Sequence, residues 1–509
     1  MICNFFTVGG WTMASRILGF VRDIMIAAFL GAGPVAEAFL VAFSLPNMFR
    51  RFFAEGAFNM AFVPLFSKKL ERGEDALGLA RDALAALGAL LILLTLIAQL
   101  AMPFLVLAMA AGFAADERLP LAVLYGRIAF PYILFISLAA LASGVLNAAG
   151  RFAAAAAAPV LLNIVFIAAL LLADQAGLDM GLTLAWAVPV AGLLQFALVW
   201  EAARRAGFLL LPRRPRRTAD LRRLAVIAAP AALAGGVVQV NLLVGRQVAS
   251  FFDGAIAWLN YADRLYQLPL GVVGIAVGVV LLPELSRRLA AGDESAQQES
   301  FSRATEFALL LTLPAAAALL AIPDVLVRGL FERGAFTAAD TAPTAAALAV
   351  YAAGLPAFVL QKVLQPLFFA RENTATPFRY ALVALVVNAG LAIGLAPLIG
   401  YLAAALGTTG AGWAMAWLLW RGSRSMGRPA RADARLAGRL PRIALAALLL
   451  AMGLKGGAFL LAGSGLDPAS PPGLALLVCG GGLLYLALLA LVGAARPAEI
   501  RSMLHRPRR

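Results

Sequence analysis

Long apolar segments recur along this chain, and they constrain its fold more than any other feature. Each is 20 or more residues long, is rich in Leu, Ala and Val, and shows no alternation of polar and apolar residues. A membrane-spanning helix needs about 20 apolar residues, whereas a membrane barrel strand alternates. Hydrophobic residues make up 62% of the 509, above the roughly 45–50% of soluble domains. We therefore predict an all-α polytopic membrane protein.

Fourteen such segments are separated by polar or Pro/Gly breaks, so we predict fourteen transmembrane helices. They lie near residues 5–31, 34–66, 77–111, 119–148, 157–178, 181–203, 224–252, 257–285, 302–326, 340–369, 376–398, 401–420, 443–463 and 471–494. The first segment lacks the basic region and cleavage site of a removable signal peptide, so we expect it to be retained.

Lysine and arginine are concentrated in alternate loops: after the second, sixth and twelfth segments, and in the tail. Loops after odd-numbered segments hold few cations and several acids, among them Asp116, Asp174 and Asp467. The positive-inside rule then predicts that both termini are cytoplasmic. A net charge of +15 suggests nucleic-acid binding in a soluble protein. Here membrane topology accounts for it, so nucleic acid is not an expected partner.

A sequence repeat divides the chain. Val63–Asp75 (VPLFSKKLERGED) matches Leu282–Glu294 (LPELSRRLAAGDE) in its proline, serine, basic pair and glycine, at an offset of 219 residues. Because six helices separate the copies, both halves share one membrane orientation, as in transporters built from parallel repeats. We predict a six-helix lobe at 1–205, a basic cytoplasmic linker at 206–223, a second six-helix lobe at 224–425, a basic loop at 426–442, two extra helices at 443–494 and a basic tail at 495–509.

Ionisable side chains lie inside predicted spans, where each costs about 2.5–3.5 kcal/mol. On one face of the first span lie Ser15, Arg16, Arg22 and Asp23. The second span carries Glu37, Asn47, Arg50, Arg51 and Glu55, and the eighth carries Asp263 and Arg264. Five arginines thus stand against four acids. A surplus of positive charge in a wet interior suits an anion, and arginine binds phosphate or carboxylate through paired hydrogen bonds.

Internal pairing is the alternative interpretation of these charges. Arg51 and Glu55 are four residues apart and can pair on their own helix. Arg22 and Asp23 can each find a partner on another helix. For Arg51 and Glu55 both interpretations stay open, whereas for Arg16, Arg22, Arg50 and Arg264 internal pairing is the weaker one.

Catalytic and metal-binding residue types are scarce. The two cysteines, Cys3 and Cys479, are far apart, and the one histidine, His505, lies in the basic tail. Hydrolytic triads and cysteine–histidine or histidine–metal sites therefore cannot be built, and no acidic cluster suits Mg²⁺. We predict that the chain is not an enzyme and uses no metal or cofactor.

Four motifs carry a family resemblance: SRILGFVRD, GAGxxAEAF, LPNxxRRxxAEGAF and YADRLYQLP. In order and spacing they resemble the MurJ (MviN) family of lipid II flippases, through twelve core spans and two extra helices. That family belongs to the multidrug/oligosaccharidyl-lipid/polysaccharide exporter superfamily. The resemblance implies a fold of two six-helix lobes in a V, followed by two helices that form a groove for a polyprenyl tail.

The resemblance also implies a cargo, a location and a site. The cargo would be lipid II, an undecaprenyl-pyrophosphate-linked disaccharide-pentapeptide, moved from the inner to the outer leaflet of the bacterial cytoplasmic membrane. Membrane lipids and cell-wall synthesis proteins are the other candidate partners. Family cavity residues match Arg16, Arg22, Asp23, Arg50 and Arg264.

Two departures from the family pattern bear on function. Glu37 stands where the family commonly has Asp, which keeps the charge and changes its reach. The stretch Val240–Arg246 in the seventh span offers no carboxylate, although some members bind sodium there, so membrane potential or protons are the more open energy sources.

Three other function classes fit parts of the sequence. An exporter of another lipid-linked oligosaccharide shares the anionic cargo and is the alternative. A membrane enzyme acting on the same lipid needs acid–base or metal-binding groups that the spans lack. A scaffold for cell-wall enzymes leaves the buried charge unexplained.

Overall fold

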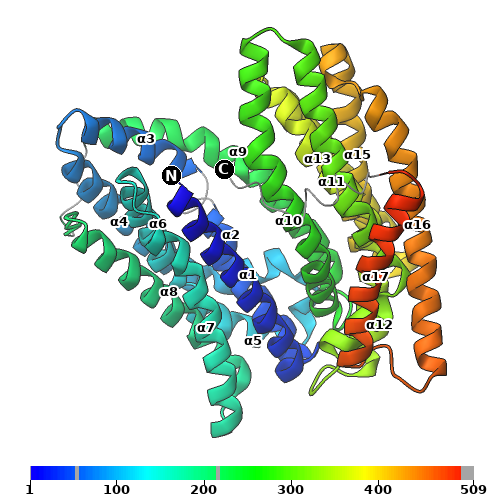
Figure 1. The fold of residues 1–509 in the computed structure, drawn as a ribbon. Helices are drawn as coiled ribbons and strands as arrows, with labels where there is room; N and C mark the ends of the chain where they lie inside the picture. Colours follow the sequence, from blue (N-terminus) through cyan, green and yellow to red (C-terminus); the bar gives the residue numbers. More distant parts are fainter. Residues whose placement is uncertain (1, 52–56, 212, 214–217, 495–509) are drawn as a thin grey trace. The chain divides into compact units, whose positions relative to one another are not determined.

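The computed structural model describes residues 2–51, 57–211, 213 and 218–494, and within these residues it is built of helices (Figure 1). One isolated bridge between Arg333 and Phe336 is the strand-like pairing found there. Lipid leaves a spanning backbone no water to bond, so apolar segments of this length satisfy their N–H and C=O groups internally as helices. The prediction of an all-α membrane protein is confirmed.

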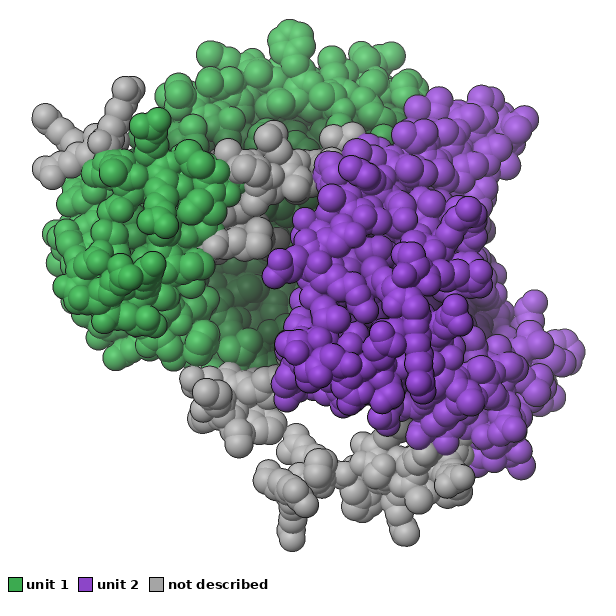
Figure 2. Space-filling view, turned by 90° about the horizontal axis from the view of Figure 1, so that it is seen from above, with its two compact units in different colours: residues 1–257, 333–336 green, residues 258–332, 337–509 purple. Residues whose placement is uncertain are grey.

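Contacts divide the chain into two compact units, coloured separately in Figure 2. Unit 1 is Met1–Ala257 with Arg333–Phe336, and unit 2 is Trp258–Glu332 with Thr337–Arg509. This division places the helix Ala219–Ala249 in unit 1. The lobe boundaries expected from the repeat stay a prediction.

Unit 1 holds nine α-helices and one short 3₁₀ helix among its described residues. They are α1 (Ile2–Leu30), α2 (Pro34–Arg50), α3 (Ala57–Glu71), α4 (Ala76–Met109), η2 (Ala111–Ala115), α5 (Arg118–Ala129), α6 (Tyr132–Ala148), α7 (Ala153–Ala176), α8 (Met180–Arg205) and α9 (Ala219–Ala249). α7 packs against α1 and α8, α5 against α2, and α9 against α3.

Unit 2 begins within α10 and contains the C-terminal helices. They are α10 (Ala255–Ala290), α11 (Glu294–Ala321), α12 (Pro323–Phe331), α13 (Ala338–Phe369), α14 (Ala375–Ile399), α15 (Leu402–Ser423), the short η3 (Arg424–Met426) and η4 (Arg428–Ala430), α16 (Ala434–Gly463) and α17 (Pro471–Leu491). α15 packs on α13 and α14, and α16 packs on α11 and α17.

Ten helical stretches in the described part are long and apolar enough to cross a membrane. They correspond to the third to sixth and ninth to fourteenth predicted segments. The other four predicted segments are helical where described, and they are the ones that carry Arg22, Glu37, Arg246 and Arg264. The total of fourteen spans therefore stays a prediction.

Two predicted spans are interrupted. The segment expected at 34–66 forms α2 and α3, with residues 52–56 outside the described part. The segment at 119–148 is broken between α5 and α6 at Phe130–Pro131, where proline cannot donate to the carbonyl four residues before it.

The sequence repeat has a counterpart in backbone conformation. Gly73 follows α3 and Gly292 follows α10, and both adopt a left-handed φ of 67°. A residue with a β-carbon is strained there, whereas glycine is not. The side chains of Asp75 and Asp293 then cap the next helix by accepting from backbone N–H groups. The repeat thus encodes one helix–glycine–cap–helix junction twice.

Candidate functional site

The first cluster of predicted site residues lies where α1 packs against α7. Arg22 and Asp23 are 7% and 6% exposed, so both are buried. Arg22 donates to the Asp23 carboxylate through Nε at 3.0 Å and through Nη2 at 2.7 Å. Its charge is therefore paired with the adjacent residue.

Asn163 on α7 holds this pair in place. Arg22 Nη1 donates to Asn163 Oδ1 at 3.0 Å, and Asn163 Nδ2 donates to the Ser15 carbonyl at 2.9 Å. The Arg22 guanidinium also lies 5.5 Å from the centre of the Phe166 ring. One buried amide thus joins Ser15 and Arg22, two predicted site residues seven positions apart on α1.

Arg16 of the first span and the residues at the end of the second span are more accessible. Arg16 is exposed, and Ser15, Asn47 and Arg50 are half-buried. Asn47 Nδ2 donates to the Phe43 carbonyl within α2 at 2.9 Å. Arg51 is exposed, and Glu55 lies outside the described residues. The Arg51–Glu55 pair therefore stays a prediction.

Asp263 and Arg264 are half-buried neighbours on α10, in unit 2. Gln267 donates to the Asp263 carboxylate through Nε2. Beside them Tyr266 packs against Tyr351, with ring centres 5.1 Å apart. The residues predicted to act together are thus divided between the two units.

Glu37 takes part in a different cluster from the α1 arginines. It is 1% exposed and accepts from Arg118 Nη1 at 2.8 Å and from the Ile256 N–H at 2.9 Å. Arg118, itself 5% exposed, also binds the carboxylates of Asp116 and Asp253, at 2.5 and 3.1 Å. Its guanidinium lies over the Phe113 ring. The hydrogen bonds from Arg118 hold the pKa of Asp116 below its ordinary value.

This cluster changes the charge balance of the candidate site. Glu37 serves Arg118, a residue that the sequence interpretation did not select, and so it is occupied elsewhere. Five arginines then stand against Asp23, Glu55 and Asp263. Glu37 is therefore removed from the acids counted for the predicted site, and the assembly of that site stays a prediction.

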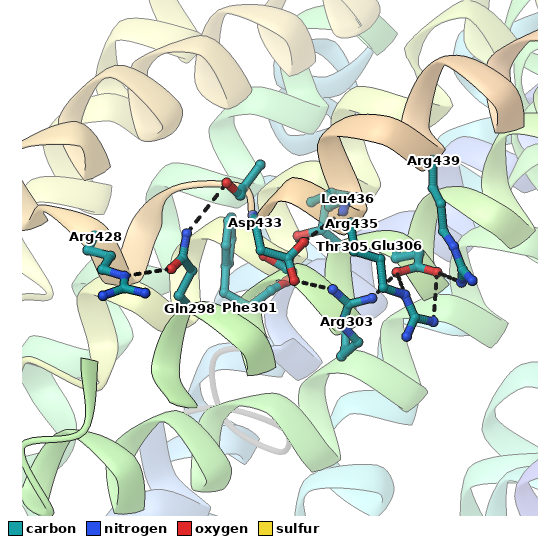
Figure 3. Close-up of polar contacts among 12 residues, drawn as sticks. Gln298, Phe301, Arg303, Thr305, Glu306, Arg428, Asp433, Arg435, Leu436 and Arg439 are labelled. Carbon is teal, nitrogen blue, oxygen red and sulfur yellow. Dashed lines mark hydrogen bonds and ion pairs between the residues drawn. The ribbon is translucent and has the colours of Figure 1, made fainter. Parts of the chain in front are cut away.

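Unit 2 contains a second set of buried charges, between α11 and α16. Glu306 is 7% exposed and lies among the guanidinium groups of Arg303, Arg435 and Arg439 (Figure 3). Arg303 also pairs with Asp433, the residue that caps α16. Every carboxylate in this set pairs with an arginine across the contact between the two helices. We therefore interpret these ion pairs as the interaction that holds α16 against α11.

Sequence reasoning missed Asn163, Arg118 and Glu306 for different reasons. Asn163 is uncharged and stands alone in an apolar segment. Arg118 follows two acids just before a predicted span, which resembles an ordinary loop. Glu306 is four residues inside the ninth predicted segment, and its intramembrane position was the signal that could have revealed it.

Metal binding finds no support in the described part of the chain, where no group of three His, Cys, Asp or Glu side chains is close enough to hold an ion.

Comparisons with known proteins agree on one family. The family model described as "Lipid II flippase MurJ" matches residues 26–464. A protein of Rhizobium meliloti (strain 1021) described as "Probable lipid II flippase MurJ" is 48% identical over 466 residues, which cover 89% of this chain and 86% of the relative.

Solved structures of membrane transporters share the fold. "Lipid II flippase MurJ, inward closed conformation" superposes with a TM-score of 0.82 at 25% identity, covering 98% of this chain and 99% of the other. An inward-facing multidrug-resistance transporter of the MATE family has a TM-score of 0.69 at 14% identity, over 84% of this chain and 99% of that one.

Proposed function

This chain belongs to the MurJ family of lipid II flippases, and we propose that it moves lipid II from the inner to the outer leaflet of the bacterial cytoplasmic membrane. The family resemblance predicted from four sequence motifs is confirmed. The family consists of transporters, so the chain is a multi-pass membrane transporter and not an enzyme.

The proposed binding group for the cargo is a set of arginines that hold its pyrophosphate. Arg16, Arg22, Arg50 and Arg264 are the contacts, with Asp23 orienting Arg22. Ser15, Glu37, Asn47, Arg51, Glu55 and Asp263 are proposed to support the site or to gate it. Arginine suits this role because its planar fork donates two parallel hydrogen bonds to a phosphate.

One observation supports this proposal above the others: Arg22 is buried on α1, a predicted span, and is fixed by two partners. Asp23 and Asn163 hold the guanidinium in one orientation. A fixed donor loses little conformational freedom when it meets its ligand. The carboxylate partner lowers the cost of the buried charge when no cargo is bound, and the other proposed arginines supply the attraction for the cargo.

Transport is proposed to proceed by alternating access between two lobes enclosing these arginines. The lobes would open first to the cytoplasm and then to the outer leaflet, and α16 and α17 would receive the polyprenyl tail. Both termini are proposed to be cytoplasmic, because the basic loops then obey the positive-inside rule.

An exporter of a different lipid-linked oligosaccharide is the alternative, since any such cargo carries the same pyrophosphate. The experiment that separates the two is translocation in proteoliposomes. Purified protein should move labelled lipid II faster than an undecaprenyl-pyrophosphate glycan without the pentapeptide. Equal or reversed rates would favour the alternative cargo.

The arginine site is tested in the same assay. Arg22→Ala and Arg264→Ala should insert and fold yet lose translocation, and Arg22→Lys should fail as well if two parallel hydrogen bonds matter. Arg151→Ala, an exposed arginine after α6, is the matched control and should remain active. Full activity of both alanine variants would overturn the site.

A further inference from the structure

Arg127 is an exposed arginine in the interior of an apolar span, and the proposed transport function does not use it. It lies on α5, within the stretch Arg118–Ala148 that is long and apolar enough to cross a membrane. The same two packed helices expose apolar side chains: Leu100 on α4 is 84% accessible and Leu124 on α5 is 48% accessible. A face of this composition is typical of contact with lipid.

Arg127 and Gln99 on α4 bond to each other reciprocally. Gln99 Nε2 donates to the Arg127 carbonyl at 2.8 Å, and Arg127 Nε donates to the Gln99 carbonyl at 3.2 Å. Gly126 allows α5 to approach α4 closely, because a β-carbon at residue 126 would lie 2.8 Å from the Met102 sulfur.

Two prolines explain the reciprocal pair. The N–H that would bond to the Gln99 carbonyl belongs to position 103, which is proline, and that for the Arg127 carbonyl belongs to position 131, also proline. Each side chain therefore supplies a donor that a proline has removed. In lipid a carbonyl without a hydrogen-bond donor costs several kcal/mol, so both side-chain hydrogen bonds stabilise the folded helices.

The hydrogen bond to the Gln99 carbonyl explains the role of Arg127 Nε. It does not explain why residue 127 carries a positive charge. A neutral donor would satisfy the Gln99 carbonyl equally well. Among the described residues no carboxylate lies within ion-pair distance of Arg127, and its guanidinium makes the single hydrogen bond to Gln99. A cation at this depth needs a counter-charge, and the described chain does not provide one.

An apolar groove runs along the same helices. It has a volume of about 100 Å³ and is lined by Ile92, Thr95, Leu96, Pro131 and Leu134. Its lining on α4 runs from Ile92 to Leu96, about 6 Å at 1.5 Å per residue, and Gln99 follows Leu96 by three residues, about one helical turn. The groove therefore begins about one turn of α4 from the residue that Arg127 bonds. It extends away from Met109, the C-terminal end of α4.

We propose that Arg127 and this groove bind one phospholipid, with the phosphate at the guanidinium and part of an acyl chain in the groove. Helical side chains lean toward the N-terminus of their own helix, here toward Arg118. In the orientation proposed above that end faces outward, so the lipid belongs to the outer leaflet. Only this assignment of the leaflet rests on the proposed function.

The test measures lipid selectivity at the groove in the full-length protein. Leu96→Cys, made in a Cys3→Ser, Cys479→Ser background, carries a fluorophore in vesicles of digalactosyl diacylglycerol. Brominated phosphatidylglycerol quenches it, and brominated digalactosyl diacylglycerol is the phosphate-free comparison. We expect the phospholipid to be preferred about fivefold, the usual effect of one arginine near an anionic lipid.

Variants separate the charge from the structural repair. Arg127→Gln keeps a donor and should abolish the preference, Arg127→Lys should retain it, and Arg151→Ala should leave it unchanged. Equal quenching by the two lipids in the unmodified site, or a preference that survives Arg127→Gln, would overturn the proposal. A stronger preference for undecaprenyl phosphate than for phosphatidylglycerol would also overturn it, since the site would then take a cargo-type lipid.

Discussion

Arg118 donates to Glu37 at 2.8 Å across the contact between α5 and α2, and both side chains are almost fully buried. Glu37 also accepts from the Ile256 N–H, and Arg118 reaches Asp253 in the turn between α9 and α10. The Arg118–Glu37 ion pair thus holds together α2, α5 and the segment from Asp253 to Ile256.

Arg118→Met should destabilise unit 1 strongly, because it leaves the Glu37 carboxylate buried without its counter-charge. Breaking a buried pair from one side costs about 3–5 kcal/mol. Thermal unfolding in detergent should show a clear loss for Arg118→Met and a smaller one for the double variant Glu37→Gln, Arg118→Met. If the losses in stability caused by Arg118→Met and Glu37→Gln simply added in the double variant, the coupling between the two side chains would be contradicted.

Acid should remove part of this stabilisation through Asp116. The pKa of Asp116 is held below its ordinary value by the hydrogen bonds from Arg118. A depressed folded-state pKa stabilises the protein above the ordinary value, about 3.9 for Asp, and the contribution disappears as pH falls through the folded pKa. The melting-temperature difference between wild type and Asp116→Asn should therefore be present at about pH 6 and shrink toward about pH 3.

The control for the pH prediction is Asp174→Asn, an exposed aspartate near the end of α7. It should follow the wild-type melting curve across the same range. A wild-type–Asp116→Asn difference that is constant with pH would contradict the role given to Asp116.

Asn163→Leu should lower lipid II translocation while leaving the Arg22–Asp23 pair in place. Arg22 loses one of its hydrogen bonds, and its guanidinium is less firmly oriented. A lost hydrogen bond to a charged group is worth about 1.5–3 kcal/mol, so a reduction of tenfold or more is expected if Arg22 must be oriented for transport. The proteoliposome assay measures this directly.

Gln195→Leu provides the comparison for Asn163→Leu. Gln195 is another buried amide of unit 1, bonded to the Ala158 carbonyl at 2.9 Å and to Tyr132. It contacts none of the proposed cargo arginines, so its loss should lower the melting temperature and spare translocation per folded molecule. Equal transport defects in the two variants would assign Asn163 to folding alone.

Glu306→Gln should weaken the attachment of α16 to α11. Three arginines lose the carboxylate they share, at a cost of about 3 kcal/mol by analogy with other buried pairs. Glu284→Gln is the matched control, because Glu284 also pairs with two arginines, Arg287 and Arg288, but at a more accessible position. Accessible pairs are worth about 0–1 kcal/mol. Similar melting temperatures for the two variants would refute the interpretation.

The sequence predicted the helices well because their cause is local. Apolar length and composition determine a spanning helix without reference to any other segment. The repeated junction was also predictable, since Gly73 and Gly292 occupy equivalent positions and share one conformation. The break at Phe130–Pro131 was less obvious, because a proline in a span can either kink a helix or end it.

The partners of the buried charges could not be predicted in the same way. Spacing shows that Arg22 and Ser15 share a face of α1, but not that Asn163, more than 140 residues later, joins them. For Glu37 the sequence offers every arginine in the neighbouring spans as a partner. Packing selects Arg118, because α2 and α5 are in contact.

The exchange of hydrogen bonds between Gln99 and Arg127 has a consequence for how these positions can vary in evolution. The Gln99 side chain is needed only while residue 131 is proline, and the Arg127 Nε only while residue 103 is proline. Across relatives we therefore expect substitutions to occur in two linked pairs, Gln99 with Pro131 and Arg127 with Pro103. A lineage that keeps Arg127 after losing Pro103 would retain the arginine for its charge.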